Sequence, residues 1–209
     1  KILHKPHIPM LREQNVRTGF FEPAQYDAVA RQLPEAVRPI LAFAYITGWR
    51  VNSEVLGLEW RQVDFDAGTV RLDPGTTKNG EGRVFPMTAG LRELLHSQKD
   101  EADRLKRAGK IVPHVFHRDG ERVRSFRRVW LSACKGAGCP GRIPHDLRRT
   151  AVRNLVRAGI PERVAMTMTG HKTRSVFERY NIVSDGDLLE AARKLDVADG
   201  RALPMTAAR

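Results

Sequence analysis

The sequence predicts a mainly α-helical fold with a small antiparallel β-sheet, an α+β class. Apolar residues recur at helical spacing in segments spread along the chain, and three short segments between residues 61 and 86 have the composition and turn signals of strands. The sequence contains no internal repeat and no heptad run, so a repeat protein or a coiled coil is not indicated. Of the 209 residues 41% are apolar, which is enough for one sizeable core, so we expect one domain or one domain with an appendage.

The first half of the chain is expected to hold the sheet. Residues 1–17 show no clear period and are interpreted as a linker or arm. Pro23 and Pro34 bound the first helix, Gly48 ends the second, and Asn79-Gly80 is the turn signal between the last two strands. The expected elements are helices at 21–33 and 35–47, a short helix capped by Asn52 or Ser53, strands at 61–65, 69–72 and 83–86, and a charged helix at 88–107.

The second half is expected to be helical. An apolar segment covers residues 111–116, and a loop covers 136–141. The last helix has an apolar stripe, and everything after about residue 197 resembles a mobile tail. The helices are expected at 125–134, 145–158, 161–168, 173–180 and 185–195.

The charge balance indicates a polyanionic partner. The formal net charge is +12 and the pI is about 10.4, and nucleic acid is the commonest partner of so basic a chain. A membrane surface is the rival interpretation. No apolar run approaches spanning length and no signal peptide is apparent, so we expect a cytoplasmic setting and no membrane partner.

The cysteine content gives no support to a metal site. Cys134 and Cys139 are the only two cysteines, and a zinc site would have to recruit distant histidines. We therefore expect free thiols and no bound metal.

One arginine stands out on the helix expected at 145–158. At about 100° per residue, Arg148 falls in the middle of the apolar face, whereas Arg149, Arg153 and Arg157 take the polar side. A guanidinium that points inward cannot lose its proton and needs a fixed acceptor or an anion. Two interpretations remain open: a structural ion pair with an interior carboxylate, or a site that receives an anionic substrate.

Several further side chains accompany Arg148 in a fixed order. The segments that carry them are Thr47-Gly48-Trp49-Arg50, Lys78 in a hairpin turn, His145-Asp146-Leu147-Arg148-Arg149-Thr150, Gly170-His171, and Tyr180 nine residues after His171. Taken singly, each has a simpler explanation as a helix cap, a solvated lysine, a core histidine or a packing aromatic. In this order and spacing, over roughly residues 18 to 195, the chain resembles the tyrosine recombinase family, the phage-type integrases.

The resemblance implies the catalytic-domain fold of these DNA breaking and rejoining enzymes, and a chemistry that suits the residue types. Arg50 and Arg148 would hold the non-bridging oxygens of a phosphodiester, and His171 would donate to the same group. Tyr180 would attack the phosphorus with His145 as its base, and Lys78 would protonate the leaving hydroxyl. The resulting 3'-phosphotyrosine conserves the bond, so neither ATP nor a metal or other cofactor is implied.

One departure from the family pattern is evident. The family usually places an acidic residue three positions after the first arginine, whereas here Ser53 holds that position and Glu54 follows it. A residue three or four positions after Arg50 lies on the same side of a helix as Arg50, so the role expected of Arg50 is unaffected.

The resemblance also implies partners and boundaries. Residues 18–183 would be the catalytic domain and 184–209 a C-terminal helix with a mobile tail, and the family's N-terminal core-binding domain would lie outside this chain. Double-stranded DNA would be the partner, with a monomer in isolation, a tetramer in synapsis, accessory DNA-bending proteins, and a bacterial or phage origin. Further phosphate contacts are expected from a set of arginines: Arg122, Arg124, Arg127, Arg128 and Arg174.

Two other functions remain compatible with these residues. A topoisomerase that nicks and reseals DNA would use much the same groups, and it would relax supercoils without a defined site. A catalytically silent DNA-binding protein of the same fold would bind tightly and form no covalent adduct.

Overall fold

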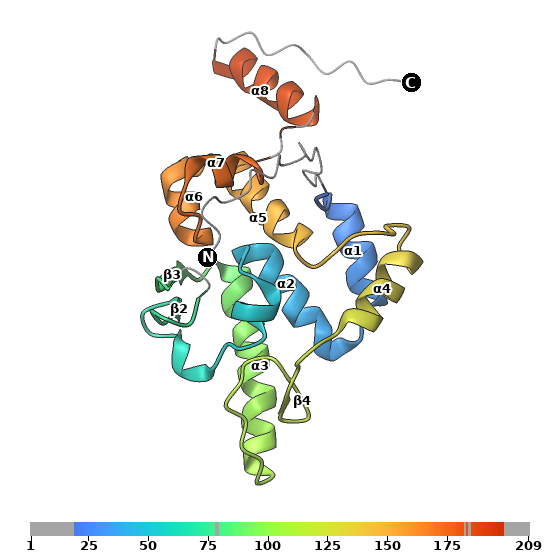
Figure 1. The fold of residues 1–209 in the computed structure, drawn as a ribbon, viewed down its shortest axis with the longest axis vertical. Helices are drawn as coiled ribbons and strands as arrows, with labels where there is room; N and C mark the ends of the chain where they lie inside the picture. The colour runs from blue at the N-terminus through green and yellow to red at the C-terminus, as the bar shows by residue number, and fades with distance from the viewer. Residues whose placement is uncertain (1–18, 78–79, 182, 184, 199–209) are drawn as a thin grey trace, which may run out of the picture.

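The computed structural model describes residues 19–198 except 78, 79, 182 and 184, and it has the predicted fold class. Helices make up most of the described chain and surround one large hydrophobic cluster and two small ones, and the small sheet lies at one side (Figure 1). Helix α3 extends at one end of the molecule, and the C-terminal helix α8 stands at the other. The predictions for the N-terminal arm and for the tail after residue 198 fall outside the described residues.

The first helices follow the proline and glycine signals. Helix α1 (Pro23–Gln32) begins with proline in its first turn, and a short 3₁₀ turn, η1 (Glu35–Val37), leads into α2 (Arg38–Thr47). Helix α2 ends at Gly48, whose φ is +66°. A Cβ at this position would also lie 2.9 Å from the Ala151 side chain, so the glycine lets the end of α2 approach α5.

The strand predictions are confirmed with one adjustment. A 3₁₀ turn, η3 (Trp60–Gln62), replaces the start of the first predicted strand, which leaves β1 (Val63–Asp64). Strands β2 (Thr69–Leu72) and β3 (Arg83–Pro86) have the predicted bounds, and the three strands pair antiparallel in the order β1-β2-β3.

The middle of the chain adds one element that was not predicted. Helix α3 (Ala89–Arg107) agrees with the prediction, but β4 (His117–Arg118) and β5 (Glu121–Arg122) form a two-stranded hairpin after it. Its turn holds Asp119-Gly120, both with positive φ. Helix α4 (Arg127–Gly136) follows and packs against α1.

The last four helices lie close to their predicted positions. Helix α5 (Asp146–Arg157) packs between α2 and α6 (Glu162–Thr169), and a short helix α7 (Arg174–Glu178) follows. Helix α8 (Asp185–Ala198) is slightly longer than predicted. Its predicted apolar stripe is exposed: Leu188, Leu189 and Leu195 are each more than 60% accessible to solvent.

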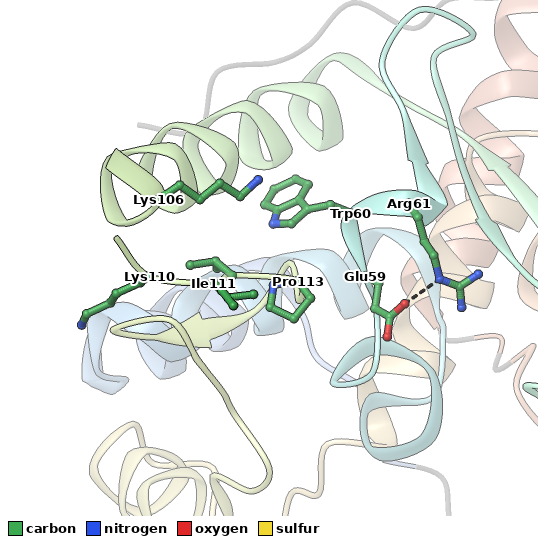
Figure 2. A pocket seen from close by; sticks show the side chains of 8 residues that line it. Glu59, Trp60, Arg61, Lys106, Lys110, Ile111 and Pro113 are labelled. Carbon is green, nitrogen blue, oxygen red and sulfur yellow. Dashed lines mark hydrogen bonds and ion pairs between the residues drawn. The ribbon is translucent and has the colours of Figure 1, made fainter. Parts of the chain in front are cut away.

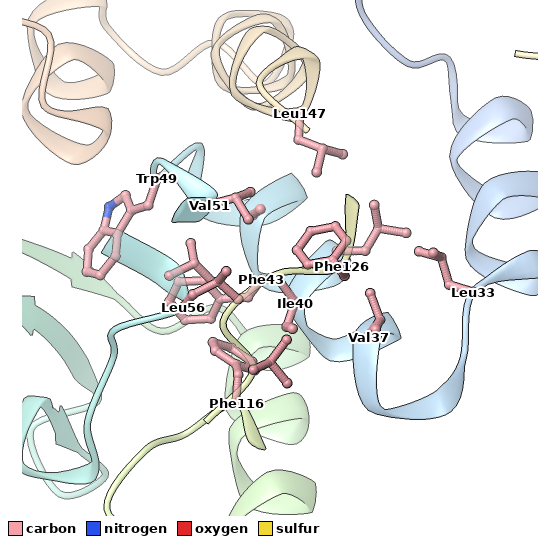
Figure 3. Close-up of a cluster of buried hydrophobic side chains, with 14 of the residues drawn as sticks. Leu33, Val37, Ile40, Phe43, Trp49, Val51, Leu56, Phe116, Phe126 and Leu147 are labelled. Atoms are coloured by element: carbon pink, nitrogen blue, oxygen red, sulfur yellow. The ribbon is translucent and has the colours of Figure 1, made fainter. Parts of the chain in front are cut away.

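The main core joins the N-terminal helices to α5. Figure 3 shows Phe43 and Ile40 of α2 among side chains from the end of α1, η1, the loop before β4, the residue before α4, and α5, with Trp49 at one edge. Trp49 is 1% exposed, and its indole nitrogen donates to the carbonyl of Met168 at 3.1 Å. This packing fixes the backbone on both sides of Arg50, the first of the candidate catalytic residues.

The two cysteines are buried and free, as predicted. Burial raises the pKa of the Cys134 thiol to about 11, so the thiol is protonated at neutral pH. In the described part of the chain, no group of three or more His, Cys, Asp or Glu side chains is placed to hold a metal ion. Nor is any helix there long and apolar enough to span a membrane.

A cavity of about 440 Å³ opens between η3 and the chain that follows α3. Figure 2 shows the Trp60 indole facing Ile111 and Pro113 across it, with Lys106 and Lys110 at its rim. None of the residues that line it belongs to the six candidate catalytic residues, so the candidate site lies elsewhere.

Candidate active site

Five of the six candidate catalytic residues lie together where α2, α5, α6 and α7 meet. Arg50 follows the end of α2, Arg148 lies in the first turn of α5, and His145 directly precedes that helix. His171 follows α6, and Tyr180 follows α7. The sixth, Lys78, falls outside the described residues.

Arg148 is buried as predicted, and its anchors are carbonyl groups. It is 2% exposed, and its Nη1 donates to the carbonyl oxygens of Gly48 at 2.6 Å and Thr169 at 2.7 Å. Its Nη2 lies 3.4 Å from Nδ1 of His171, and Nε has no hydrogen-bond partner among the described residues. The structural alternative, an ion pair with an interior carboxylate, is therefore not what holds this side chain. Nε is buried without a partner and Nη2 has only the long contact to His171, so these two donors are the ones left to pair with an anion.

Arg50 is held by Glu54 despite the unusual spacing. The carboxylate of Glu54 accepts from the backbone N–H of Arg50 and from its Nη1, both at 2.7 Å. Glu54 is fully buried, whereas the Arg50 side chain is 24% exposed. Glu54 therefore contacts Arg50 although it follows Arg50 by four residues and not by three.

A π-helical turn, η2 (Val51–Val55), explains how the spacing is accommodated. The N–H of Val55 donates to the carbonyl of Arg50, and that of Leu56 donates to Val51, each five residues back. A π turn holds one more residue than an α turn, so it absorbs the extra position before Glu54. The prediction that Asn52 or Ser53 caps a short helix is wrong, because the helical turn begins directly after Arg50 and both side chains are exposed within it.

Arg83 is a buried member of the site that the sequence analysis did not single out. Its Nη2 donates to Oε1 of Glu54 at 2.7 Å, and its Nη1 donates to the carbonyl of Thr169 at 2.6 Å. The alternating burial of β3 places Arg83 on the same face as buried Phe85. That alternation is a sequence signal that could have found it.

Tyr180 lies inside the site, with its hydroxyl on His145. Oη of Tyr180 is 2.9 Å from Nε2 of His145, and the Tyr180 ring lies 4.7 Å from the His171 ring, centroid to centroid. The guanidinium carbons of Arg148 and Arg149 lie 5.7 Å and 5.2 Å from the Tyr180 ring centroid. The tyrosine is thus already beside the arginines in this structure.

Both histidines are neutral at physiological pH. Burial is the largest cause that lowers the pKa of His145 to about 4, and the neighbouring cations Arg148, Arg149 and Arg50 contribute in the same direction. Burial together with Arg148, Arg50 and Arg83 lowers the pKa of His171 to about 3. A neutral His145 has one nitrogen with a lone pair, so it can accept a proton from the phenol.

The surroundings of His171 point one nitrogen into the site. Its Nδ1 lies 2.8 Å from Oγ1 of Thr169, a hydroxyl that itself lies 2.7 Å from the carbonyl of Ala165. The contact with Arg148, which can only donate, would need a lone pair on Nδ1, but it is long at 3.4 Å. The shorter contact decides: the Thr169 hydroxyl hydrogen is directed to the Ala165 carbonyl, which favours Nδ1–H as the donor to Thr169. Nε2 is buried and finds no hydrogen-bond partner in the part of the chain that the structure describes.

Two arginines of α5 were predicted to lie on its polar side, but the structure buries both. Arg149 is 9% exposed and pairs with Asp146 at 3.0 Å, and Arg153 is 2% exposed and pairs with Glu22 at 2.8 Å. The guanidinium of Arg153 also lies 3.8 Å from the ring centroid of Phe20. The prediction fails because segments from both ends of the described chain cover the second face of α5. Arg157 is exposed, as predicted.

The arginines proposed as further DNA contacts are all exposed, and two have local partners. Nε of Arg122 donates to the carbonyl of Leu56 at 2.7 Å, and Arg174 pairs with Glu162 and Glu178. Arg124 lies between β5 and α4, and Arg127 and Arg128 lie in the first turn of α4.

Fold and site together define a class: a mainly helical domain whose buried arginines and neutral histidines surround one tyrosine. Residues 21–186 match the model of the phage integrase family, and the chain belongs to this family. Its members include the tyrosine recombinases that the sequence analysis indicated.

The relatives and solved structures agree with this assignment. The chain is 27% identical to the integrase of Salmonella phage P22, over 98% of this chain and 54% of that protein. It is 28% identical to tyrosine recombinase XerD of Neisseria meningitidis serogroup B, over 71% of this chain and 50% of XerD. Its fold is similar to that of the XerA recombinase crystal structure, with a TM-score of 0.69 and 20% identity. The match covers 90% of this chain and 67% of the XerA chain. The chain thus spans about half the length of these two curated relatives.

Proposed function

We propose that the chain is the catalytic domain of a site-specific DNA recombinase or integrase that cuts and rejoins strands through a 3'-phosphotyrosine. The observation that carries this proposal is the contact between Oη of Tyr180 and Nε2 of His145, beside the buried guanidinium of Arg148. A packing tyrosine has no need of a neutral imidazole at hydrogen-bond distance from its hydroxyl, whereas a nucleophile does.

Cleavage would proceed by attack of the Tyr180 oxygen on the scissile phosphorus. His145 would take the phenolic proton as the bond to phosphorus forms, and the bond from phosphorus to the 5' oxygen of the next deoxyribose would break. Lys78 is proposed to protonate that oxygen as it leaves. Rejoining reverses these steps with the 5' hydroxyl of another strand, so the phosphodiester is conserved without ATP or a metal.

The arginines would bind the phosphate as negative charge gathers on its non-bridging oxygens. Nε and Nη2 of Arg148, which have no oxygen acceptor among the described residues, suit a paired contact, and the exposed part of the Arg50 guanidinium can supply a second. His171 would add a third contact through Nε2 after it gains a proton. An anion in the site offsets the repulsion from neighbouring cations, which raises the pKa of His171 and of His145.

Double-stranded DNA is the proposed substrate. A lambda integrase structure with a similar fold, at a TM-score of 0.64, is a dimer bound to a core site, and a net charge of +12 suits a phosphate backbone. Arg122, Arg124, Arg127, Arg128 and Arg174 are proposed as backbone contacts. By analogy with the family we propose a monomer for the isolated chain, a tetramer in synapsis, accessory DNA-bending proteins and a bacterial or phage cytoplasm as the setting.

Covalent capture tests the proposal directly. The protein is incubated in EDTA with nicked fragments of the genome that encodes it, and DNA that stays attached after denaturation is recovered and sequenced. We expect wild-type adducts at one defined site and none with Tyr180→Phe, while Tyr180→Phe still binds that site. The matched control Tyr45→Phe, which alters a tyrosine packed against Tyr26 at the edge of the core, should keep the adduct.

Four results would count against the proposal. An adduct in Tyr180→Phe would identify another nucleophile, and a requirement for a divalent metal would contradict the mechanism. Wild-type adducts spread over unrelated sequences would favour a topoisomerase instead. Tight binding with no adduct from any fragment would favour a silent DNA-binding protein.

A further inference from the structure

Arg83 is a third buried arginine, next to the two arginines that are proposed to bind phosphate. It opens β3, is 9% exposed, and belongs to none of the motif segments that carry the family resemblance. Burial lowers the pKa of its guanidinium and the charge of Arg50 acts in the same direction, whereas the carboxylate of Glu54 opposes both effects. A third cation in such a place needs a reason other than fold stability.

The hydrogen bonds of Arg83 give that reason, because it shares an acceptor with each of the other two arginines. Oε1 of Glu54 accepts from Nη1 of Arg50 and from Nη2 of Arg83, both at 2.7 Å. The carbonyl oxygen of Thr169 accepts from Nη1 of Arg148 at 2.7 Å and from Nη1 of Arg83 at 2.6 Å. The planar fork of Arg83 therefore connects the anchor of Arg50 to the anchor of Arg148.

The surroundings of Arg83 leave its fork few alternative placements. Its guanidinium carbon lies 5.8 Å from the Trp49 ring centroid, and Trp49 directly precedes Arg50. On the other side it contacts Gly170 so closely that a Cβ there would overlap the guanidinium. Gly170 ends α6 with φ +73° and directly precedes His171. Arg83 thus fits between the two backbone segments that carry Arg50 and His171.

We propose that Arg83 is a positioning residue for phosphodiester cleavage: its fork sets the spacing between Arg50 and Arg148 by holding Glu54 and the Thr169 carbonyl together. This inference rests on the proposed recombinase function. A shift of about 1 Å in groups that contact the reacting atoms can lower a rate constant by about 100-fold. Lysine at position 83 keeps the charge but has one nitrogen, so it cannot hold both acceptors in the geometry of the fork.

The test compares Arg83→Lys and Arg83→Met with wild type and with the control Arg92→Met. Arg92 is a matched control because its Nη1 also donates to a backbone carbonyl, that of Phe65 at 2.8 Å, and it makes no contact with the site arginines or Glu54 in the described chain. Three quantities are measured: the melting temperature, the Kd for nicked DNA that carries the captured site, and the single-turnover rate constant of adduct formation well below the melting temperature.

We expect the rate constant to fall at least tenfold in Arg83→Lys and about 100-fold in Arg83→Met, with the Kd for DNA changed less than threefold. Arg92→Met should keep the wild-type rate constant even if its melting temperature falls. If Arg83→Met does not fold, Arg83→Lys decides, because it retains the positive charge beside Glu54.

Two outcomes would overturn the inference in different ways. If wild type forms the adduct and Arg83→Lys forms it at the same rate, Arg83 only stabilises the fold and the positioning role is wrong. If wild type forms no adduct with any fragment, the proposed function itself fails, and the positioning role fails with it.

Discussion

Replacing Glu54 by glutamine should destabilise the fold more than any substitution of an exposed carboxylate. Glu54 is fully buried and accepts three hydrogen bonds, two from Arg50 and one from Arg83. Glutamine has nearly the same shape but no charge, and one of its two oxygens becomes an NH₂ donor. That donor would face an N–H group, and two guanidiniums would lose their only carboxylate partner in the described chain.

The size of the effect follows from the burial of this carboxylate. Removing one partner of a buried ion pair costs roughly 3–5 kcal/mol, because the charge left behind is desolvated and uncompensated. Arg50 is partly exposed and can recover some hydration, so we place the loss near the lower bound, about 3 kcal/mol. For a domain of this size that corresponds to a melting temperature lower by about 6–12 °C.

Urea unfolding at pH 7.5 measures the free energy of unfolding, with Glu101→Gln as the control. The Glu101 side chain is 41% exposed and pairs with Arg104 on the surface of α3, so its loss should leave the free energy nearly unchanged. A Glu54→Gln protein as stable as the control would refute the reasoning, since it would mean that the guanidiniums need no buried carboxylate. Because Glu54 also positions Arg50, the adduct should form more slowly in Glu54→Gln.

Two further predictions concern the π-helical turn and the histidines. Deleting the exposed Asn52 should convert the π turn into an α turn, restore the family's spacing and keep adduct formation; loss of the adduct with the fold intact would contradict this. The pKa values of His145 and His171 are lowered on folding to about 4 and 3, so their contribution to the free energy of unfolding is complete above about pH 6.5 and is lost as the pH falls towards those values. Urea unfolding at pH 7.5 and 5 should show a smaller loss for His171→Asn than for wild type, and an equal loss would contradict the assignment.

Much of the architecture could be predicted because local signals and packing agree. Proline and glycine mark the ends of α1 and α2, and period-two alternation marks the strands, so these elements appear at or near their predicted bounds. The inward direction of Arg148 was predictable for the same reason, since the apolar face of α5 is turned towards α2. The β4–β5 hairpin was not predicted, because strands of two residues have too few positions to show alternation.

The missed parts of the site share a different physical origin. Helical periodicity shows which face meets the first neighbour, but it carries no information on whether another segment covers the opposite face. Arg149 and Arg153 were predicted to lie on the polar side of α5. They are buried because Asp146 on the same helix and Glu22 from before α1 supply carboxylates. Arg83 was missed because its two acceptors are 29 and 86 residues away along the chain.

The same cations have two opposite effects on the site, and this links substrate binding to proton transfer. Arg148 and Arg50 would bind the phosphate, and together with burial they also lower the pKa of both histidines. With no anion present, His145 is therefore a weak base beside the Tyr180 hydroxyl, so the phenol keeps its proton. A phosphate held by the arginines brings negative charge within a few ångströms, which raises the basicity of His145 and favours a protonated His171. Under the proposed function, Tyr180 would thus become a nucleophile only when the phosphate that it attacks is in place.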